Sequence, residues 1–295
     1  MFREFRFSFP KQLSHRHFRK TLNIEGIKTQ AQRKMSKTEI RTVKLLEMLQ
    51  TNERVDVKTV TAALDISEAT ARRLFAKLEQ EGEVIRTLGG VKLAPQLGHD
   101  YSFRVSISHR SREKTQIGTA AAELVNSNER IFLDSGTTVL KLAEALAVKI
   151  HTGAIENLVV VTNSVTLIEI LAKSCKVILI GGEIRAERRD VCGTIAEKTL
   201  LMFHVDKAFL GADAISLTSG LMTTDERTSK MSEIIIERAD KTYILADSEK
   251  FHKTSFVTYA PVCAATTILT DDGVTPETVA AFTDLGAQIE IVHSC

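Results

Sequence analysis

Hydrophobic positions recur with a helical period in three successive segments that begin near Lys37. In the first segment, apolar residues fall about every three positions, at Ile40, Val43, Leu46 and Leu49. A second, shorter helix is predicted over Val57–Leu64, with an apolar face formed by Val60, Ala63 and Leu64. A third is predicted over Ser67–Glu81, because Ser67 is a favourable N-cap and one apolar stripe follows it, made of Ala71, Leu74, Phe75 and Leu78.

The opposite side of the third helix is polar and basic. Thr70, Arg73 and Lys77 lie there with Arg72 beside them, and Gly82 ends the helix. Glu83–Thr87 and Val91–Ala94 flank Leu88-Gly89-Gly90 and predict a tight hairpin. This order of elements is that of a winged helix-turn-helix, which holds a basic helix in the major groove of DNA. A small helical cap with a solvated charged face is the alternative. The candidate DNA-contacting residues are Lys58, Ser67, Glu68, Thr70, Arg72, Arg73, Lys77, Gly89 and Gly90.

Beyond this region, short apolar runs alternate with helical segments. The expected strands are Ile131–Leu133, Leu158–Val161, Val177–Ile180, Ala208–Leu210, Tyr243–Ala246, Ile268–Leu269 and Ile289–Val292. The expected helices are Arg112–Val125, Val139–Leu146, Val165–Ala172, Ala196–Phe203, Ser229–Ala239 and Pro276–Leu285. Such alternation predicts an α/β fold with a mainly parallel, doubly wound, Rossmann-like sheet. We therefore expect a basic flexible extension over 1–35, a winged helix over 36–95, a linker over 96–111 and an α/β domain over 112–295.

Polar residues of the α/β domain cluster directly after its predicted strands. Ligands of open α/β sheets bind at the carboxyl ends of the strands, near a switch in strand order, so these clusters predict one small-molecule pocket. The alternative for any single cluster is simple helix capping. The candidate effector-binding residues are Asp134, Ser135, Gly136, Thr137, Thr138, Asn163, Ser164, Gly181, Gly182, Gly211, Ala212, Asp213, Lys230, Asp247 and Lys250.

The first cluster is typical of a phosphate site. Residues 135–138, Ser-Gly-Thr-Thr, lead directly into a predicted helix, where hydroxyls and backbone N–H groups favour an anion. Asp134 and Asp213 are acceptors suited to sugar hydroxyls, and Lys230 or Lys250 could supply positive charge.

Composition sets limits on the class of protein. The chain has 295 residues, of which 43% are hydrophobic and 26% charged, which is ordinary for a globular protein and excludes collagen-like or wholly disordered chains. Its apolar runs are far shorter than the roughly 20 residues that span a bilayer, and we see no secretory signal. The four cysteines, Cys175, Cys192, Cys263 and Cys295, are not spaced for a disulfide framework or a zinc site. A cytoplasmic protein without metal or cofactor is expected.

Charge is unevenly distributed along the chain. Residues 1–35 carry nine Lys/Arg against two acidic residues, whereas residues 99–295 carry twenty against twenty-six. A basic N-terminal segment and an acidic remainder are expected if only the N-terminal segment binds a polyanion. A basic disordered tail without such a role would give the same charge distribution. Translation could also begin at Met35, which would remove the basic extension altogether.

Several motifs resemble those of the DeoR family of bacterial transcriptional regulators. The segment 67–73, Ser-Glu-Ala-Thr-Ala-Arg-Arg, is similar to the family pattern S-x-x-T-I-R-R-D-L, with Gly82 and Gly89-Gly90 following. The chain departs from this pattern at Ala71, at Leu74-Phe75 and at Leu88, which replaces a histidine. Further matches are 133–138 (LDSGTT), 161–164 (VTNS), 180–182 (IGG), 210–213 (LGAD), 220–221 (GL) and 246–251 (ADSEKF).

The resemblance covers most of residues 36–295 and implies both a fold and a function. It implies a sensor domain similar in fold to ribose-5-phosphate isomerase and the sugar-phosphate deaminases. It also implies an oligomeric transcription factor, most often a repressor of a sugar-catabolism operon, whose partners are double-stranded operator DNA and a phosphorylated sugar.

An isomerase-like enzyme is the competing class. Such chemistry needs a carboxylate base beside the bound sugar. In the isomerases the Gly-Ala-Asp turn continues with a glutamate, whereas here Gly211-Ala212-Asp213 continues with Ala214-Ile215. The glycine-rich lysine motif of those enzymes is also absent, and Glu226-Arg227 with Lys230 is a poor substitute. A metal sensor lacks a ligand cluster. The sequence therefore favours a regulator over an enzyme.

Overall fold

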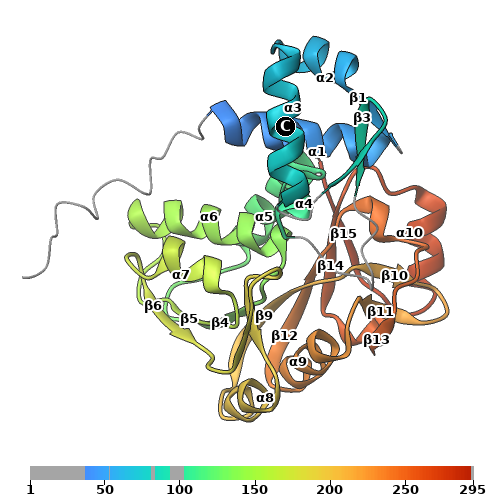
Figure 1. Cartoon of the computed structure of the whole chain (residues 1–295). Coiled ribbons are helices and arrows are strands. Elements are labelled where there is room, and N and C mark those ends of the chain that lie inside the picture. Colours follow the sequence, from blue (N-terminus) through green and yellow to red (C-terminus); the bar gives the residue numbers. More distant parts are fainter. Residues whose placement is uncertain (1–36, 53, 81–83, 94–102, 294–295) are drawn as a thin grey trace, which may run out of the picture. The chain divides into compact units, whose positions relative to one another are not determined.

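The computed structural model describes residues 37–293, apart from residues 53, 81–83 and 94–102 (Figure 1). The basic extension over 1–35 lies outside the described residues.

The N-terminal part of the described chain is a winged helix. Its elements are α1 (Lys37–Thr51), β1 (Val55–Asp56), α2 (Val57–Leu64), α3 (Glu68–Gln80), β2 (Val84–Thr87) and β3 (Gly90–Leu93). The strands form an antiparallel sheet in the order β1-β3-β2. Strand β1, of only two residues, was not expected, and it pairs Val55 with Val91.

The core of the winged helix confirms the predicted stripe of α3. Ala71, Leu74, Phe75 and Leu78 are all buried, and they pack with Leu45, Leu46 and Leu49 of α1. Two expected core residues are exposed instead: Ile40 is 42% exposed, and Ala63 is on the surface of α2. Among the described residues, the buried positions of α1 lie in its second half.

The C-terminal part is an α/β domain with a seven-stranded, wholly parallel sheet (Figure 1). Its strands are β4 (Arg130–Leu133), β5 (Val159–Thr162), β6 (Lys176–Leu179), β9 (Val205–Gly211), β12 (Ala239–Leu245), β14 (Thr267–Asp271) and β15 (Ile289–Val292). Its helices are α4 (Phe103–Ser108), α5 (Ser111–Glu123), α6 (Thr137–His151), α7 (Val165–Leu171), α8 (Thr194–Leu200), α9 (Glu226–Glu237) and α10 (Pro276–Thr283). The predicted α/β class and doubly wound sheet are confirmed.

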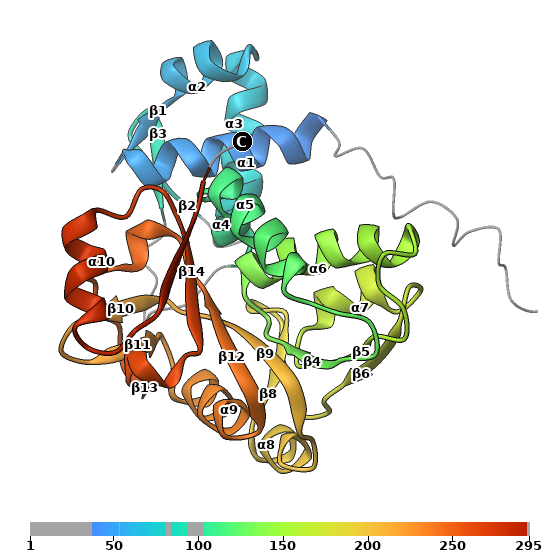
Figure 2. The same cartoon turned by 180° about the vertical axis from the view of Figure 1, so that it is seen from behind.

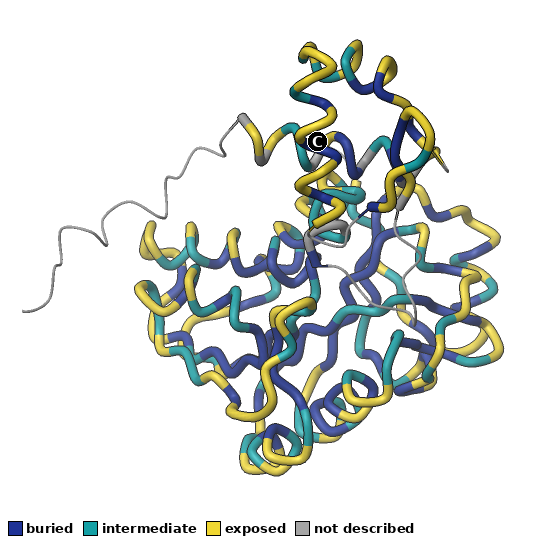
Figure 3. The backbone as a smooth tube through the Cα atoms, in the orientation of Figure 1, coloured by how far each residue is buried: buried dark blue, intermediate teal, exposed yellow. Residues whose placement is uncertain are grey.

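Two apolar layers cover the sheet, because successive side chains of a strand point to opposite faces. Ile131 and Leu133 of β4 pack with residues of α5, α6 and α7, whereas Phe132 packs with residues of α8, α9 and α10. Figure 2 shows the two groups of helices on either side of the sheet, and Figure 3 shows the buried strands between them.

The strand order β15-β14-β12-β9-β4-β5-β6 reverses direction next to β4. From β4 the chain proceeds outward through β5 and β6, then returns to place β9 on the other side of β4. Backbone segments diverge at the carboxyl ends of β4 and β9, which is where open sheets bind ligands.

Several features of the α/β domain were not predicted. A small antiparallel sheet contains β10 (Ala214–Ser216), β11 (Gly220–Thr223) and β13 (Val257–Ala260). A hairpin pairs β7 (Glu183–Arg185) with β8 (Asp190–Cys192). Helix α4 lies inside the segment 96–111, which the sequence indicates as a linker, and its Phe103 is buried against the α5–α7 side of the domain. Single-turn helices also occur at Ser248–Lys250 and Val262–Ala264.

Candidate effector pocket and DNA-binding surface

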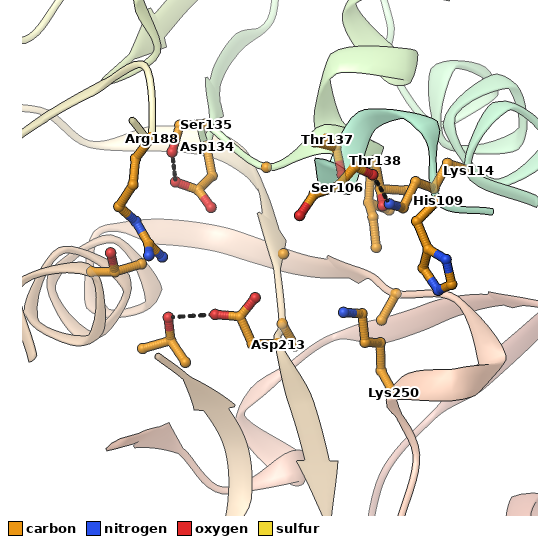
Figure 4. A pocket seen from close by; sticks show the side chains of 17 residues that line it. Ser106, His109, Lys114, Asp134, Ser135, Thr137, Thr138, Arg188, Asp213 and Lys250 are labelled. Carbon is orange, nitrogen blue, oxygen red and sulfur yellow. Dashed lines mark hydrogen bonds between the residues drawn. The ribbon is translucent and has the colours of Figure 1, made fainter. Parts of the chain in front are cut away.

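A pocket of about 290 Å³ opens at the carboxyl ends of β4 and β9. It lies at the switch in strand order, where the sequence analysis places it. The lining residues are Ser106, His109, Lys114, Asp134, Ser135, Gly136, Thr137, Thr138, Arg188, Gly211, Ala212, Asp213, Thr223, Thr228, Leu245, Ala246 and Lys250. Figure 4 shows Lys114, His109 and Lys250 toward one end, and Arg188, Asp134 and Asp213 toward the other.

The loop after β4 leads directly into α6 and forms the centre of the pocket wall. Gly136 is the N-cap of α6, and Thr137 and Thr138 begin the helix. The first N–H groups of a helix have no partner within it, and together with the helix dipole they favour an anion. The hydroxyls of Thr137 and Thr138 belong to the same wall. This geometry suits an oxyanion such as phosphate.

Lys114 of α5 is the most unusual residue of the pocket, because it is a cation with only 4% of its surface exposed. Its Nζ donates a hydrogen bond of 2.6 Å to the carbonyl oxygen of Ser106 in α4. Burial lowers the pKa of Lys114 to about 8, because an ammonium loses hydration there. The charge of Asp247 raises this pKa, while Lys250 and Arg110 lower it further.

The other end of the pocket is acidic. Burial raises the pKa of Asp134, and the nearby carboxylate of Asp190 raises it further, although hydrogen bonds from Ser135, Asn163 and Gly211 oppose the shift. An aspartate with a raised pKa can donate as well as accept, which suits a sugar hydroxyl.

Asp213 is held in place by two donors. Its Oδ2 accepts hydrogen bonds of 3.0 Å from the Thr223 hydroxyl and from the Thr224 backbone N–H. The small antiparallel sheet supplies Thr223, so this sheet, which was not predicted, positions the carboxylate.

An ionic network anchors the β7–β8 hairpin beside the pocket. The Arg185 guanidinium lies 2.6 Å from Asp190 and 2.7 Å from Asp225, the N-cap of α9. Burial opposes the charge of Arg185, but the hydrogen bonds and charges of Asp190, together with the charge of Asp225, outweigh burial and raise its pKa. Ser135 donates to Asp190 at 3.3 Å, which joins the network to the loop after β4. The hairpin thereby brings Arg188 to the pocket wall.

The structure brings together nine of the fifteen candidate effector residues. Those in the pocket wall are Asp134, Ser135, Gly136, Thr137, Thr138, Gly211, Ala212, Asp213 and Lys250. Those outside it are Asn163, Ser164, Gly181, Gly182, Lys230 and Asp247.

Most of the outlying candidates have structural partners. Ser164 caps α7 by accepting from the N–H of Leu167. Lys230 is half exposed and lies 2.8 Å from Glu233 on the same helix. A Cβ on Gly182 would approach the carbonyl oxygen of Cys192 to 2.6 Å, so this glycine permits close packing of the hairpin. Asp247 is buried, accepts a hydrogen bond from the N–H of Glu249 and lies 3.7 Å from the guanidinium of Arg110.

Sequence reasoning missed several lining residues, namely Ser106, His109, Lys114, Arg188, Thr223, Thr228, Leu245 and Ala246. Lys114 carried a detectable signal, because it lies three positions before Ile117 and seven before Ala121, in the apolar stripe of the predicted helix. A lone cation in such a stripe is costly unless it has a function or a partner. We find no comparable signal for Arg188.

The candidate DNA-binding surface is the exposed side of α3 together with the β2–β3 hairpin, which we call the wing. Arg72, Arg73 and Lys77 are exposed, and Thr70 is half-buried. Ser67 accepts from the N–H of Thr70 at 3.3 Å, which caps the helix. Arg72 lies 3.6 Å from Glu68 one turn earlier. Lys58 of α2 is also exposed.

The wing depends on its glycines. Gly89 adopts a φ of +81°, which side chains rarely tolerate. A Cβ on Gly90 would lie 2.3 Å from the carbonyl oxygen of Val55, so only glycine lets β1 approach β3 here. Both glycines therefore shape the hairpin, and the Gly89 carbonyl oxygen accepts a hydrogen bond from the Val57 N–H.

Comparison with known proteins establishes the family. The described chain combines a winged helix with an α/β domain that has a pocket at the switch in strand order. Residues 41–96 match the DeoR-like helix-turn-helix domain, and residues 109–272 match the DeoR C terminal sensor domain. This chain belongs to the DeoR family.

Named relatives align over most of their length. The chain is 32% identical to the transcriptional repressor GlcR of Bacillus subtilis, over 79% of this chain and 88% of that protein. It is 31% identical to the regulator YgbI of Escherichia coli K12, over 78% and 88% of the two chains. It is 26% identical to a putative aga operon transcriptional repressor of Escherichia coli O157:H7, over 88% and 96%.

Among solved structures, the chain is similar to ribose 5-phosphate isomerase A of Methanocaldococcus jannaschii. The TM-score is 0.36 and the identity 18%, over 47% of this chain and 53% of that one. In the described part of the chain, no helix is long and apolar enough to cross a membrane. Within the same residues, His, Cys, Asp and Glu side chains form no group that could hold a metal ion. Cys175, Cys192 and Cys263 are free thiols, and Cys295 lies outside the described residues.

Proposed function

We propose that this chain is a DNA-binding transcriptional repressor of a carbohydrate-catabolism operon, released from its operator by a phosphorylated sugar or related metabolite. Support for the DNA-binding half comes from the capped basic helix and the glycine-shaped wing. Support for repression comes from relatives named as repressors, such as GlcR and the aga operon repressor.

The observation that carries the effector class is the polarity of the pocket. One end combines the N-terminus of α6 and its threonine hydroxyls with Lys114 and Lys250, which suits a phosphate. Asp134 and Asp213 lie toward the other end, where they suit hydroxyl groups. The volume of about 290 Å³ is at the lower limit of ordinary ligand pockets, which favours a monosaccharide over a dinucleotide.

A thermal-shift screen of the full chain tests this proposal. Sugars and their phosphates are compared in matched pairs, and only phosphorylated members should raise the melting temperature, because binding to the folded state stabilises it. The same compounds should release the protein from operator DNA. Stabilisation by free sugars, with none by any phosphorylated compound, would contradict the phosphate site.

Two lysines provide matched variants for the screen. Lys250→Met should abolish the stabilisation, because Lys250 lines the pocket. Lys230→Met should leave it intact, because Lys230 is exposed and pairs with Glu233.

An isomerase-like enzyme is the second candidate, and the raised pKa of buried Asp134 favours it. A carboxylate whose pKa moves toward neutrality is a better general base. Exchange of the carbon-2 hydrogen of a stabilising phosphosugar with deuterated water, followed by NMR, tests this candidate. Exchange that depends on Asp134, lost in Asp134→Asn, would establish an enzyme, and its absence at full occupancy supports a regulator.

The proposal also includes a homo-oligomer that acts in the cytoplasm. Helix-turn-helix proteins commonly bind two half-sites as symmetric dimers. Light scattering of the full chain, alone and with operator DNA, gives the number of subunits. A single subunit per operator would overturn this part of the proposal.

A further inference from the structure

The segment Phe103–Arg110, which includes α4, forms part of the effector pocket although the sequence indicates a linker there. Ser106 and His109 line the pocket directly. The segment follows the wing in the chain, and residues 94–102 between them lie outside the described residues. Phe103–Arg110 therefore belongs to the part of the chain between the wing and α5.

Contacts at both ends and in the middle hold the segment in place. At the start, Phe103 is buried and its N–H donates to the carbonyl oxygen of Glu187, in the turn of the β7–β8 hairpin. At the end, the Arg110 guanidinium lies 2.7 Å from Asp271 and 3.2 Å from Glu249. In the middle, the carbonyl oxygen of Ser106 accepts from Lys114.

The middle contact is costly without a ligand. Lys114 is buried, its hydrogen-bond partner is a neutral carbonyl, and it forms no ion pair among the described residues. A buried cation without an ion-pair partner is unfavourable. Burial accordingly lowers the pKa of Lys114 to about 8, although the more distant charge of Asp247 opposes this shift. When the segment leaves the domain, water can reach the ammonium and the cost disappears.

The backbone conformation of Arg110, between α4 and α5, also disfavours the docked segment. Arg110 has a φ of +50°, in the left-handed region that non-glycine residues seldom occupy. Such a conformation is unfavourable for a non-glycine residue and persists only where contacts enforce it. The docked segment is thus held by strong contacts at its ends against two local costs.

We propose that the effector's anionic group controls the docking of Phe103–Arg110, by forming with Lys114 the ion pair that this lysine does not make with any described residue when the segment is docked. An anion at the N-terminus of α6 enters the pocket that Lys114, Ser106 and His109 line. It binds the docked state better than the undocked state, because only the docked state presents a complete wall. By linkage, it stabilises docking by the same factor. This inference rests on the proposed effector site and adds its regulation.

Hydrogen exchange of the full chain, read by mass spectrometry with and without inorganic phosphate, tests the proposal. Without phosphate, amides of 103–110 should exchange faster than those of α5 and α6. At a phosphate concentration ten times its Kd, exchange of 103–110 should slow by about elevenfold, the factor expected when only the docked state binds. Amides of 134–140 should be protected together with them, whereas those of α7 should not change.

Lys114→Met distinguishes two roles for Lys114: control of docking through its charge, or a hydrogen bond that only holds the segment in place. Removing the cation removes the cost of docking, so residues 103–110 should be protected without phosphate and show no further response to it. If the lysine only holds the segment, the variant should instead expose it. Lys149→Met is the matched control, because Lys149 also donates to a backbone carbonyl, that of Ala122, but does not line the pocket. It should respond to phosphate like the parent protein.

The outcomes distinguish this inference from the function on which it rests. Protection of 134–140 without slower exchange at 103–110 would overturn the docking inference and leave the anion site standing. Faster exchange at 103–110 on adding phosphate would overturn it as well. Failure of phosphate to protect either segment would contradict the anion site itself.

Discussion

At the scale of the residue, Lys114 sets the expected pH dependence of anion binding. An anion binds the ammonium form, which is lost as pH rises through about 8, the pKa that burial gives to Lys114. Sulfate affinity should therefore be flat below pH 8 and fall by up to about tenfold per pH unit above it. Sulfate is the suitable probe, because its charge does not change over this range. Calorimetric titration between pH 7 and 9.5 measures the effect.

The charged groups around Lys114 are Asp247, Lys250, Arg110 and Glu113. Together with burial, they set the pH above which sulfate affinity falls, and we call this fall the pH step. Lys114→Met should remove the step, leaving weaker binding without its dependence on pH. A step at pH 8 that persists in Lys114→Met would assign the titration to another group.

Arg72 and Arg73 of α3 should differ in what they contribute to DNA binding. Both are exposed, but Arg72 also lies 3.6 Å from Glu68 along the helix. We expect Arg73 to contact a base, so Arg73→Ala should cost about 1–3 kcal/mol and relax preference at one base pair. Arg72→Ala should weaken binding to all DNA sequences alike. It should also make the slope of log affinity against log salt concentration shallower by about one.

Fluorescence anisotropy on a duplex selected from a random pool, over a range of salt concentrations, measures both arginine effects. Ala76, exposed on the same helix between these arginines and Lys77, provides a neutral control as Ala76→Ser. If neither arginine variant altered affinity, α3 would not be the recognition helix.

At the scale of the element, the sequence predicted the parallel sheet because its strands are short apolar runs followed by polar turns. Strand β4, with Ile131, Phe132 and Leu133 all buried, is an example. The β4 loop and the end of β9 were placed correctly for the same reason, since Asp134 and Asp213 directly follow recognisable strands.

The elements that escaped prediction are those that depend on tertiary contacts. Strands β7 and β8 have three residues each, and the ionic network of Arg185 with Asp190 and Asp225 fixes them in place. Helix α4 has six residues, including the β-branched Val105 and Ile107, and thus a low intrinsic helix propensity. Its position comes from Phe103 and Lys114, which a local pattern cannot reveal. These elements supply Arg188 and Ser106, and this explains why sequence analysis left the pocket incomplete.

The packing of α5 against α6 depends on Gly118. A Cβ at this position would lie 2.5 Å from the backbone nitrogen of Leu142 and 2.6 Å from the carbonyl carbon of Lys141. Gly118→Ala should force the helices apart and cost about 1–3 kcal/mol, despite the better helix propensity of alanine. Gly181→Ala is the control, because a Cβ added at this position would have no atom within 4 Å. Chemical denaturation measures both, and an unchanged midpoint for Gly118→Ala would show that the helices can adjust.

At the scale of the whole molecule, the basic extension should add nonspecific attraction to DNA. Residues 1–35 carry nine cations and two acids, and such charge releases counterions when it meets a duplex. Deleting residues 1–34 should lower nonspecific affinity, mostly at low salt, while leaving the melting temperature and phosphate response intact.

Intact-mass measurement of the protein made from its native gene is the necessary companion to that deletion. A mass that matches initiation at Met35 would remove the extension from the mechanism. The winged helix would be unaffected, because its first element begins at Lys37. A deletion that changed the phosphate response would contradict the division of roles between the extension and the pocket.

The two ends of the mechanism are coupled by thermodynamics, and this coupling can be measured on the whole molecule. If phosphate favours a state that binds operator DNA poorly, then saturating DNA must weaken phosphate binding by the same factor by which phosphate weakens DNA binding. Titrating phosphate with and without saturating operator, and operator with and without saturating phosphate, should give two equal factors, typically about 5–150-fold. Lys114→Met, in which docking no longer depends on an anion, should reduce both factors toward one together. If phosphate bound the variant and the parent protein with undiminished coupling, the signal would have to leave the pocket by a route other than the segment Phe103–Arg110.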